Sequence, residues 1–133
     1  MTLSATDTET CHGAAGDKAG SRVFSCIRDL LAHHARTAPD RHALLAPGCE
    51  PLTYAALWLR ANELVYELRS FGVGRNDRVA VVLPGGLEAA LATIAVAAGA
   101  VCVPLHPGFA ADEWHRYFAA LRVAALLTCK QID

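Results

Sequence analysis

The fold of this chain is decided by residues 78–127, which read RVAVVLPGGLEAALATIAVAAGAVCVPLHPGFAADEWHRYFAALRVAALL. Three short, mostly apolar runs, 78–83, 100–103 and 123–127, alternate with two stretches of helical length. Apolar runs without polar alternation are typical of strands that are buried on both faces of a parallel sheet. The order of these elements predicts a parallel βαβαβ unit, and therefore an α/β fold.

The two stretches between the predicted strands are expected to form helices. The first, 87–98, carries a single charged residue, Glu88, and should end at Gly99. The second should begin near Asp112, and its aromatic residues, which we expect to join the core, are Trp114, Tyr117 and Phe118. Right-handed crossovers would place both helices on the same side of the sheet if the strand order runs in one direction.

The residues before 78 predict additional N-terminal helices. Ser25 is expected to cap a first helix, and a short strand is expected over 41–46. In 54–71 the apolar residues recur at helical spacing. Thr53 precedes this stretch, where an N-cap residue belongs, and Gly72 follows it, where a left-handed C-cap belongs.

Length and composition limit the chain to one domain. It has 133 residues, of which 53% are hydrophobic and 19% are charged, and its formal net charge is −1. This composition excludes intrinsic disorder for most of the chain, and the charge gives no reason to expect nucleic acid as a partner. Residues 1–22 are rich in small and polar residues, so we expect a disordered leader there and a folded part over 23–133.

The cysteines favour a reducing compartment. There are five, an odd number, they are widely spaced, and no CxxC pair occurs. A secreted disulfide scaffold would be shorter and denser in cysteine, so we expect a cytoplasmic protein with Cys102 and Cys129 as small core residues. No apolar segment of a secretory signal opens the chain.

A membrane span is the alternative for one segment. Residues 89–111 contain no charged residue and are long enough to cross a bilayer. Gly99, Pro104 and Pro107 divide the segment, and its second apolar piece is short and β-branched. Two buried elements of a soluble sheet explain this pattern better than one spanning helix, so we expect no membrane span.

Two positions near the predicted strand ends could carry chemistry. The loop 84–87, Pro-Gly-Gly-Leu, lies between a strand and a helix, where a phosphate loop would lie. It lacks the third glycine and the Lys-Ser/Thr of such loops, and Glu88 would repel a phosphate, so a tight turn is favoured. His106 follows a strand at the position where open α/β sheets bind ligands, but a structural role is favoured for a loop histidine without a visible partner.

The remaining candidates favour structural roles. His33 and His34 are adjacent, so they point about 100° apart on a helix and cannot share a metal as an i, i+4 pair does. Asp112 and Glu113 are expected to stabilise the first turn of a helix. We assign no catalytic, cofactor-binding or metal-binding residue from these patterns. A flavodoxin-like nucleotide binder stays a rival interpretation of the α/β pattern.

Several motifs in one order resemble the adenylate-forming superfamily, the AMP-dependent synthetases and ligases. They lie between about Val23 and Thr128 and include Leu52-Thr53-Tyr54, Asp77-Arg78-Val79, Ala98-Gly99-Ala100 and Val103-Pro104-Leu105. The superfamily comprises acyl-CoA synthetases, adenylation domains of peptide synthetases, and luciferases. The ending with Glu113, Tyr117 and Phe118 looks closer to an acyl-CoA synthetase. Ala56 stands where the family usually has Glu, and His106 where it usually has Asp or Asn.

The resemblance implies a fold and a reaction for a full-length relative. The fold is the first part of the large N-terminal domain, and the reaction joins a carboxylate and ATP into an acyl-adenylate, then transfers the acyl group to a thiol. ATP, Mg and CoA are therefore implied for a full-length member. The family's catalytic motifs have no matching position in these 133 residues, so the resemblance carries over no site residue.

From this resemblance we expect a fragment of such a ligase that is inactive by itself. The alternative is a non-catalytic interaction module or remnant derived from the family. A sheet that stops after its third strand leaves an unpaired edge, and such an edge pairs with other chains. The expected partner is the remainder of the synthetase chain, or a second copy through that edge.

Overall fold

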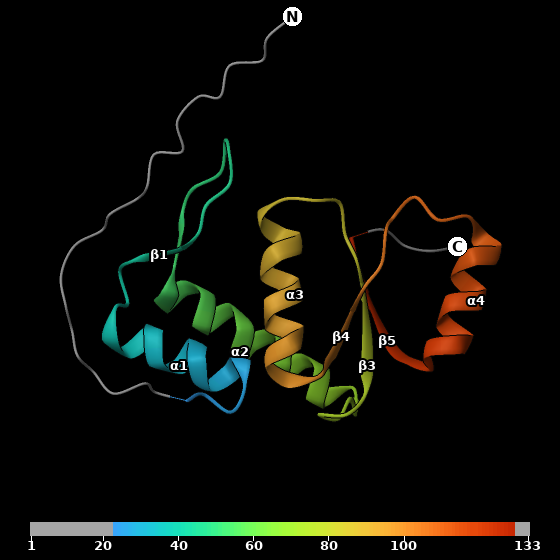
Figure 1. The fold of residues 1–133 in the computed structure, drawn as a ribbon, viewed down its shortest axis with the longest axis horizontal. Helices are drawn as coiled ribbons and strands as arrows, with labels where there is room; N and C mark the ends of the chain where they lie inside the picture. The colour runs from blue at the N-terminus through green and yellow to red at the C-terminus, as the bar shows by residue number, and fades with distance from the viewer. Residues whose placement is uncertain (1–22, 130–133) are drawn as a thin grey trace, which may run out of the picture.

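The computed structural model describes residues 23–129 (Figure 1). The predicted leader, with Cys11 and His12, lies outside this range. Its elements, in chain order, are α1 (Ile27–Thr37), β1 (His42–Leu44), β2 (Leu52–Thr53), α2 (Tyr54–Ser70), β3 (Arg78–Val82), α3 (Leu87–Gly99), β4 (Val101–Pro104), α4 (Ala111–Leu121) and β5 (Val123–Thr128).

The predicted parallel βαβαβ unit is confirmed. Strands β3, β4 and β5 form a parallel sheet in the order β4-β3-β5, and Arg78 pairs with both Val101 and Val123. The strand order reverses after β4, because β4 and β5 lie on opposite sides of β3. Right-handed crossovers then place α3 and α4 on opposite faces of the sheet, as Figure 1 shows, and not on one side.

The central strand explains the continuous apolar run of the sequence. Alternate residues of a strand point to opposite faces, and Val79, Ala80 and Val81 are all buried. On one face, Val79 and Val81 pack with residues of α2 and α3, which include Leu68, Ala92 and Val96. Burial on both faces therefore favours apolar residues at every position of β3.

Helix α3 ends at Gly99 as predicted, but the reason differs. A Cβ atom at this position would lie 2.5 Å from Val65 Cγ2 and 2.9 Å from Val65 Cγ1 of α2. The glycine is thus required by the close contact of two helices, and the C-cap residue is Ala100. Gly72 does adopt the predicted left-handed conformation, with φ of 81° directly after the C-cap of α2.

The N-terminal helices form a second layer of packing. Leu31 of α1 packs with Leu57 and Ala61 of α2 and with Ala95 and Ala98 of α3. Thr53 caps α2 as predicted, because its Oγ1 accepts a hydrogen bond of 3.3 Å from the Ala56 amide.

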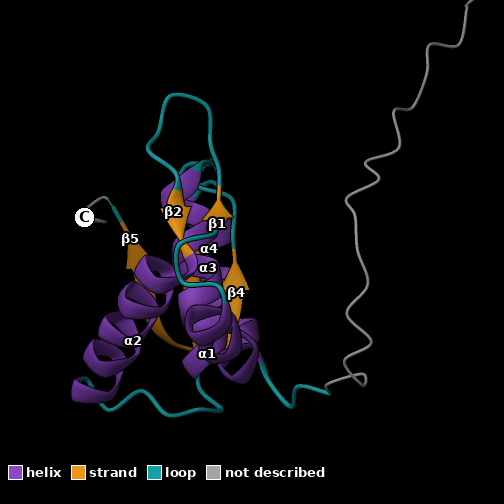
Figure 2. Cartoon of the chain, turned by 90° about the vertical axis from the view of Figure 1, so that its left-hand side faces the viewer, coloured by secondary structure: helices purple, strands orange, loops and turns teal. Residues whose placement is uncertain are grey.

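One N-terminal prediction is wrong, and another is confirmed with shorter bounds. The N-cap of α1 is Cys26, which makes no side-chain capping bond, so Ser25 is not the cap. The strand predicted over 41–46 is only His42–Leu44, and it pairs antiparallel with β2, which was not predicted. Figure 2 shows this pair and its connecting loop projecting beyond the helices. A two-residue strand shows no periodicity, so the sequence contains no signal for it.

The uncharged segment 89–111 is divided among α3, β4 and the loop that follows. In the part of the chain that the structure describes, no helix combines the length and apolar character that crossing a membrane requires.

Candidate functional site

A pocket of about 410 Å³ lies at the carboxyl ends of the three parallel strands. Its lining comes from the ends of β3 and β5, from the loops that follow β3 and β4, and from α4, and comprises Val82, Pro84, His106, Pro107, Gly108, Trp114, Thr128 and Cys129. The chain leaves β3 toward α3 on one face and leaves β4 toward α4 on the other. Open α/β sheets bind ligands at such a switch point, so this pocket is the candidate site.

His106 contributes an imidazole ring to the pocket. The Gly108 amide donates a hydrogen bond of 3.0 Å to His106 Nδ1, so the neutral ring carries its proton on Nε2. A Cβ atom at position 108 would lie 2.9 Å from His106 Cε1, so the glycine permits this close turn. His106 therefore holds the loop after β4, which agrees with the structural role favoured from the sequence.

The aromatic residues of α4 do not join the core, contrary to prediction. No residue of α4 is buried, and Tyr117 is 38% exposed. The Phe109 ring is 5.6 Å from the ring of Trp114 and stacks on Tyr117 at 5.1 Å, and Trp114 is 5.5 Å from Phe118. These rings form a partly exposed cluster beside the pocket, because no further layer of the described chain covers α4.

The loop 84–87 adopts a tight turn at the start of α3. Gly86 is the N-cap residue, with φ of 128°, a conformation that L side chains rarely adopt. The loop lines a second depression of about 340 Å³ together with Cys49, Glu88 and Cys129. Glu88 thus adds negative charge beside the loop in the first turn of α3, where it would repel a phosphate, and this favours the tight-turn interpretation.

The other candidates have structural surroundings. His34 stacks on Tyr54 with ring centroids 4.8 Å apart. Glu113 Oε2 accepts a hydrogen bond of 2.9 Å from the Ala110 amide, which confirms its expected role in the first turn of α4. Among residues 23–129, no three His, Cys, Asp or Glu side chains gather closely enough to hold a metal ion.

The two cysteines that were expected in the core, Cys102 and Cys129, differ in their burial. Cys102 is half-buried, and burial raises the pKa of its thiol. Cys129 is exposed and lines the pocket, so its prediction as a core residue is wrong. Thr128 and Cys129 were not recognised as site residues, although they lie at the carboxyl end of β5, as His106 lies just beyond the carboxyl end of β4.

The chain matches a protein-family model described as AMP-binding enzyme over residues 31–133. The chain belongs to this adenylate-forming family. It is 36% identical over 112 residues to the phosphinothricin tripeptide synthetase PhsC of Streptomyces viridochromogenes, a match that covers 84% of this chain and 10% of PhsC. It is 33% identical over 106 residues to a medium/long-chain-fatty-acid–CoA/3-oxocholest-4-en-26-oate–CoA ligase of Mycobacterium marinum, covering 79% of this chain and 19% of the ligase.

The fold agrees with this membership. The N-terminal domain of FACL13 from Mycobacterium tuberculosis superposes with a TM-score of 0.71 at 26% identity, over 79% of this chain and 27% of that one. The chain thus spans about a tenth to a fifth of the two curated relatives, and family membership replaces the flavodoxin-like alternative.

Proposed function

We propose that this chain supplies the first part of the N-terminal domain of an acid–thiol ligase of the acyl-CoA synthetase type. Such an enzyme converts a carboxylate and ATP into an acyl-adenylate and pyrophosphate, and then transfers the acyl group to a thiol. The observation that carries the proposal is the family match over residues 31–133, combined with coverage of only 10% and 19% of two relatives. The residues Glu113, Tyr117 and Phe118, which follow the proline-containing loop, favour the acyl-CoA synthetases over the peptide synthetases.

The 133-residue chain is proposed to be inactive alone, because its described residues do not fit ATP and Mg. A triphosphate requires cations and a divalent metal requires carboxylates around the transferred group. No lysine, arginine or carboxylate of the described residues lines the candidate pocket, whose polar side chains are one imidazole, one indole, one hydroxyl and one thiol. This pocket is therefore proposed to form one wall of a site that other parts of a ligase complete. The free thiols of the described cysteines support a cytoplasmic setting.

Exchange between ATP and pyrophosphate tests the proposal. We expect no carboxylate-dependent exchange from the 133-residue chain, and exchange with at least one carboxylate from the complete native reading frame. Exchange by the short chain would contradict its inactivity. A reading frame that stops after Asp133, or one that continues without giving exchange, would contradict the ligase assignment.

A non-catalytic interaction module is the second candidate, and the open sheet edges favour it. Within the described residues, β4 and β5 each pair on one side only, with β3. Unpaired edges combine with other strands, from the remainder of a synthetase or from a second copy. Sedimentation of the short chain should show concentration-dependent association, and a monomer at all concentrations would contradict pairing between copies.

A further inference from the structure

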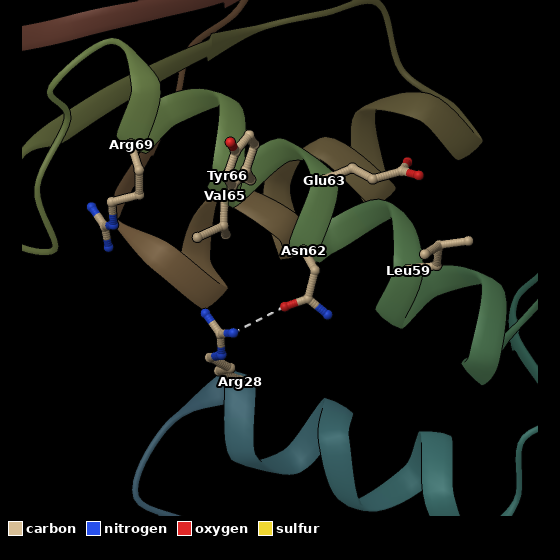
Figure 3. Close-up of a pocket in the computed structure, with 7 residues that line it drawn as sticks. All are labelled: Arg28, Leu59, Asn62, Glu63, Val65, Tyr66 and Arg69. Atoms are coloured by element: carbon tan, nitrogen blue, oxygen red, sulfur yellow. Dashed lines mark hydrogen bonds between the residues drawn. The ribbon is translucent and has the colours of Figure 1, made fainter.

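A groove of about 530 Å³ follows the outer face of α2 beside α1 (Figure 3). Its lining comprises Arg28, Leu59, Asn62, Glu63, Val65, Tyr66 and Arg69. None of these residues lines the pocket at the strand ends. The groove is therefore a surface separate from the candidate site.

The apolar part of the groove is unusually exposed. Leu59 is 59% exposed and Tyr66 is 76% exposed, whereas Val65 beside them is buried. The two exposed residues lie seven positions apart, so they occupy the same face of the helix, two turns from one another. Exposed apolar side chains along one helix face offer a surface against which an amphipathic partner helix can lay its apolar face, and tyrosine is enriched at such contacts.

Two arginines contribute positive charge to the same groove. The Arg28 guanidinium donates a 3.0 Å hydrogen bond to Asn62 Oδ1, and the Arg69 guanidinium donates to the carbonyl oxygens of Gly99, at 2.6 Å, and Val73. All of these acceptors are neutral, so neither charge is balanced by a carboxylate of the described residues. Glu63 lines the groove too, but in Figure 3 its side chain points away from Arg28.

The spacing of the charges defines the partner. Asn62, which holds Arg28, and Arg69 are seven residues apart on α2, or about 10 Å along the axis. We infer that the groove binds an acidic amphipathic helix of another polypeptide. Carboxylates two turns apart on that helix pair with Arg28 and Arg69, and apolar residues between them cover Tyr66. Leu59, three residues before Asn62, extends the apolar surface beyond the first carboxylate.

A second copy of this chain fits the groove less well. A two-fold contact brings the same patch of each copy together, and this patch carries two arginines against one glutamate, so a net positive surface would face a net positive surface. Like charges that face one another across an interface oppose binding. An acidic partner neutralises the charges instead.

A designed peptide tests the inference on the full 133-residue chain. The probe is a fluorescein-labelled helical peptide with Glu at positions i and i+7 and Leu at i+3 and i+4, and the measurement is fluorescence anisotropy. We expect saturable binding that weakens about tenfold in Arg28→Glu, equivalent to about 1.4 kcal/mol, and that weakens as salt is raised. Arg60→Glu is the matched control, because Arg60 is an exposed arginine of α2 outside the groove.

Further variants distinguish the occupants. A peptide with Lys in place of both Glu residues should bind Arg28→Glu better than it binds the unaltered chain, and Tyr66→Ser should weaken binding without changing the circular dichroism. Equal loss in Arg28→Glu and Arg60→Glu, or no saturable binding at low salt, would overturn the inference. A chain that begins at Val23 provides a further test. If it binds the peptide more tightly than the full chain does, residues 1–22, which carry Asp7, Glu9 and Asp17, compete for the groove, and the inference of a separate partner would be overturned.

Discussion

The contact between Gly99 and Val65 permits a prediction whose sign depends on the partner residue. In Gly99→Ala the new Cβ atom would lie 2.5 Å from Val65 Cγ2 and 2.9 Å from Cγ1, well inside van der Waals contact. Val65 is β-branched and lies within α2, where one χ1 rotamer is strongly preferred, so its two methyl groups cannot readily turn away from the new atom. Overpacking of this kind costs about 1–3 kcal/mol.

A second effect of the substitution acts in the opposite direction. Replacing glycine by alanine within a helix stabilises the helix by about 0.5–1 kcal/mol. Gly99 is the last residue of α3, so we expect a stabilisation at the lower end of this range. We therefore expect Gly99→Ala to lower the free energy of unfolding by about 1–2 kcal/mol net. In a Val65→Ala background both γ carbons are gone, and the nearest remaining side-chain atom is Cβ at 3.2 Å.

The same substitution should then be stabilising. Val65→Ala alone removes two buried methyl groups and costs about 1.5–3 kcal/mol, but adding Gly99→Ala to it should recover about 0.5 kcal/mol. Urea unfolding of the four chains, followed by circular dichroism, measures the coupling between the two positions.

Gly85→Ala is the control for the loss of a glycine, because a Cβ atom added at position 85 would meet nothing within 4 Å and the φ of Gly85 is not positive. Its free energy of unfolding should stay within about 0.5 kcal/mol of the unaltered value. Equal destabilisation by Gly99→Ala in both backgrounds would refute the steric argument.

Three further predictions concern single side chains. Thr53→Ala should lower the free energy of unfolding by about 1 kcal/mol through loss of the α2 cap, whereas Thr53→Ser should retain most of it, as urea midpoints will show. His106→Ala should cost about 0.5 kcal/mol because the Gly108 amide loses its acceptor; His106→Asn, whose side chain can accept from the same amide, should keep the melting temperature closer to the original. Burial raises the pKa of the Cys102 thiol, so a smaller fraction of it is thiolate at a given pH. After treatment with iodoacetamide at pH 7.5, peptide mapping should therefore find that the exposed Cys49 is modified faster than Cys102. The rate of Cys102 modification should approach that of Cys49 only at higher pH. Equal labelling of both thiols at pH 7.5 would argue against that protection.

The long elements could be predicted from the sequence because their signals are local. Helix α2 combines a 3.6-residue apolar period with Thr53 and Gly72 at its ends, and β3 is an apolar run between a charged turn and a proline loop. The strand order could not be predicted. Whether β5 pairs beside β4 or across β3 depends on the face that α4 covers, and no local pattern specifies that face.

The sites were less predictable because they combine distant segments. The rule that ligands bind at the carboxyl ends of parallel strands pointed to His106. That Thr128 and Cys129 also line the pocket could be recognised only once the place of β5 in the sheet was known. The groove depends on Arg28 reaching Asn62, 34 positions later in the chain, through the docking of α1 on α2. The aromatic residues of α4 show the converse case, since a helical apolar stripe alone does not reveal whether anything covers it.

The position of β3 at the centre of the sheet has a consequence during synthesis. This strand is made before both of its neighbours, and Arg78 pairs with Val123, which follows about 45 residues later. At about 5–20 residues per second, the ribosome needs roughly 2–9 s to add those residues. Throughout that interval one side of the most buried strand of the described sheet has no native partner, which makes it a target for chaperones and for neighbouring nascent chains.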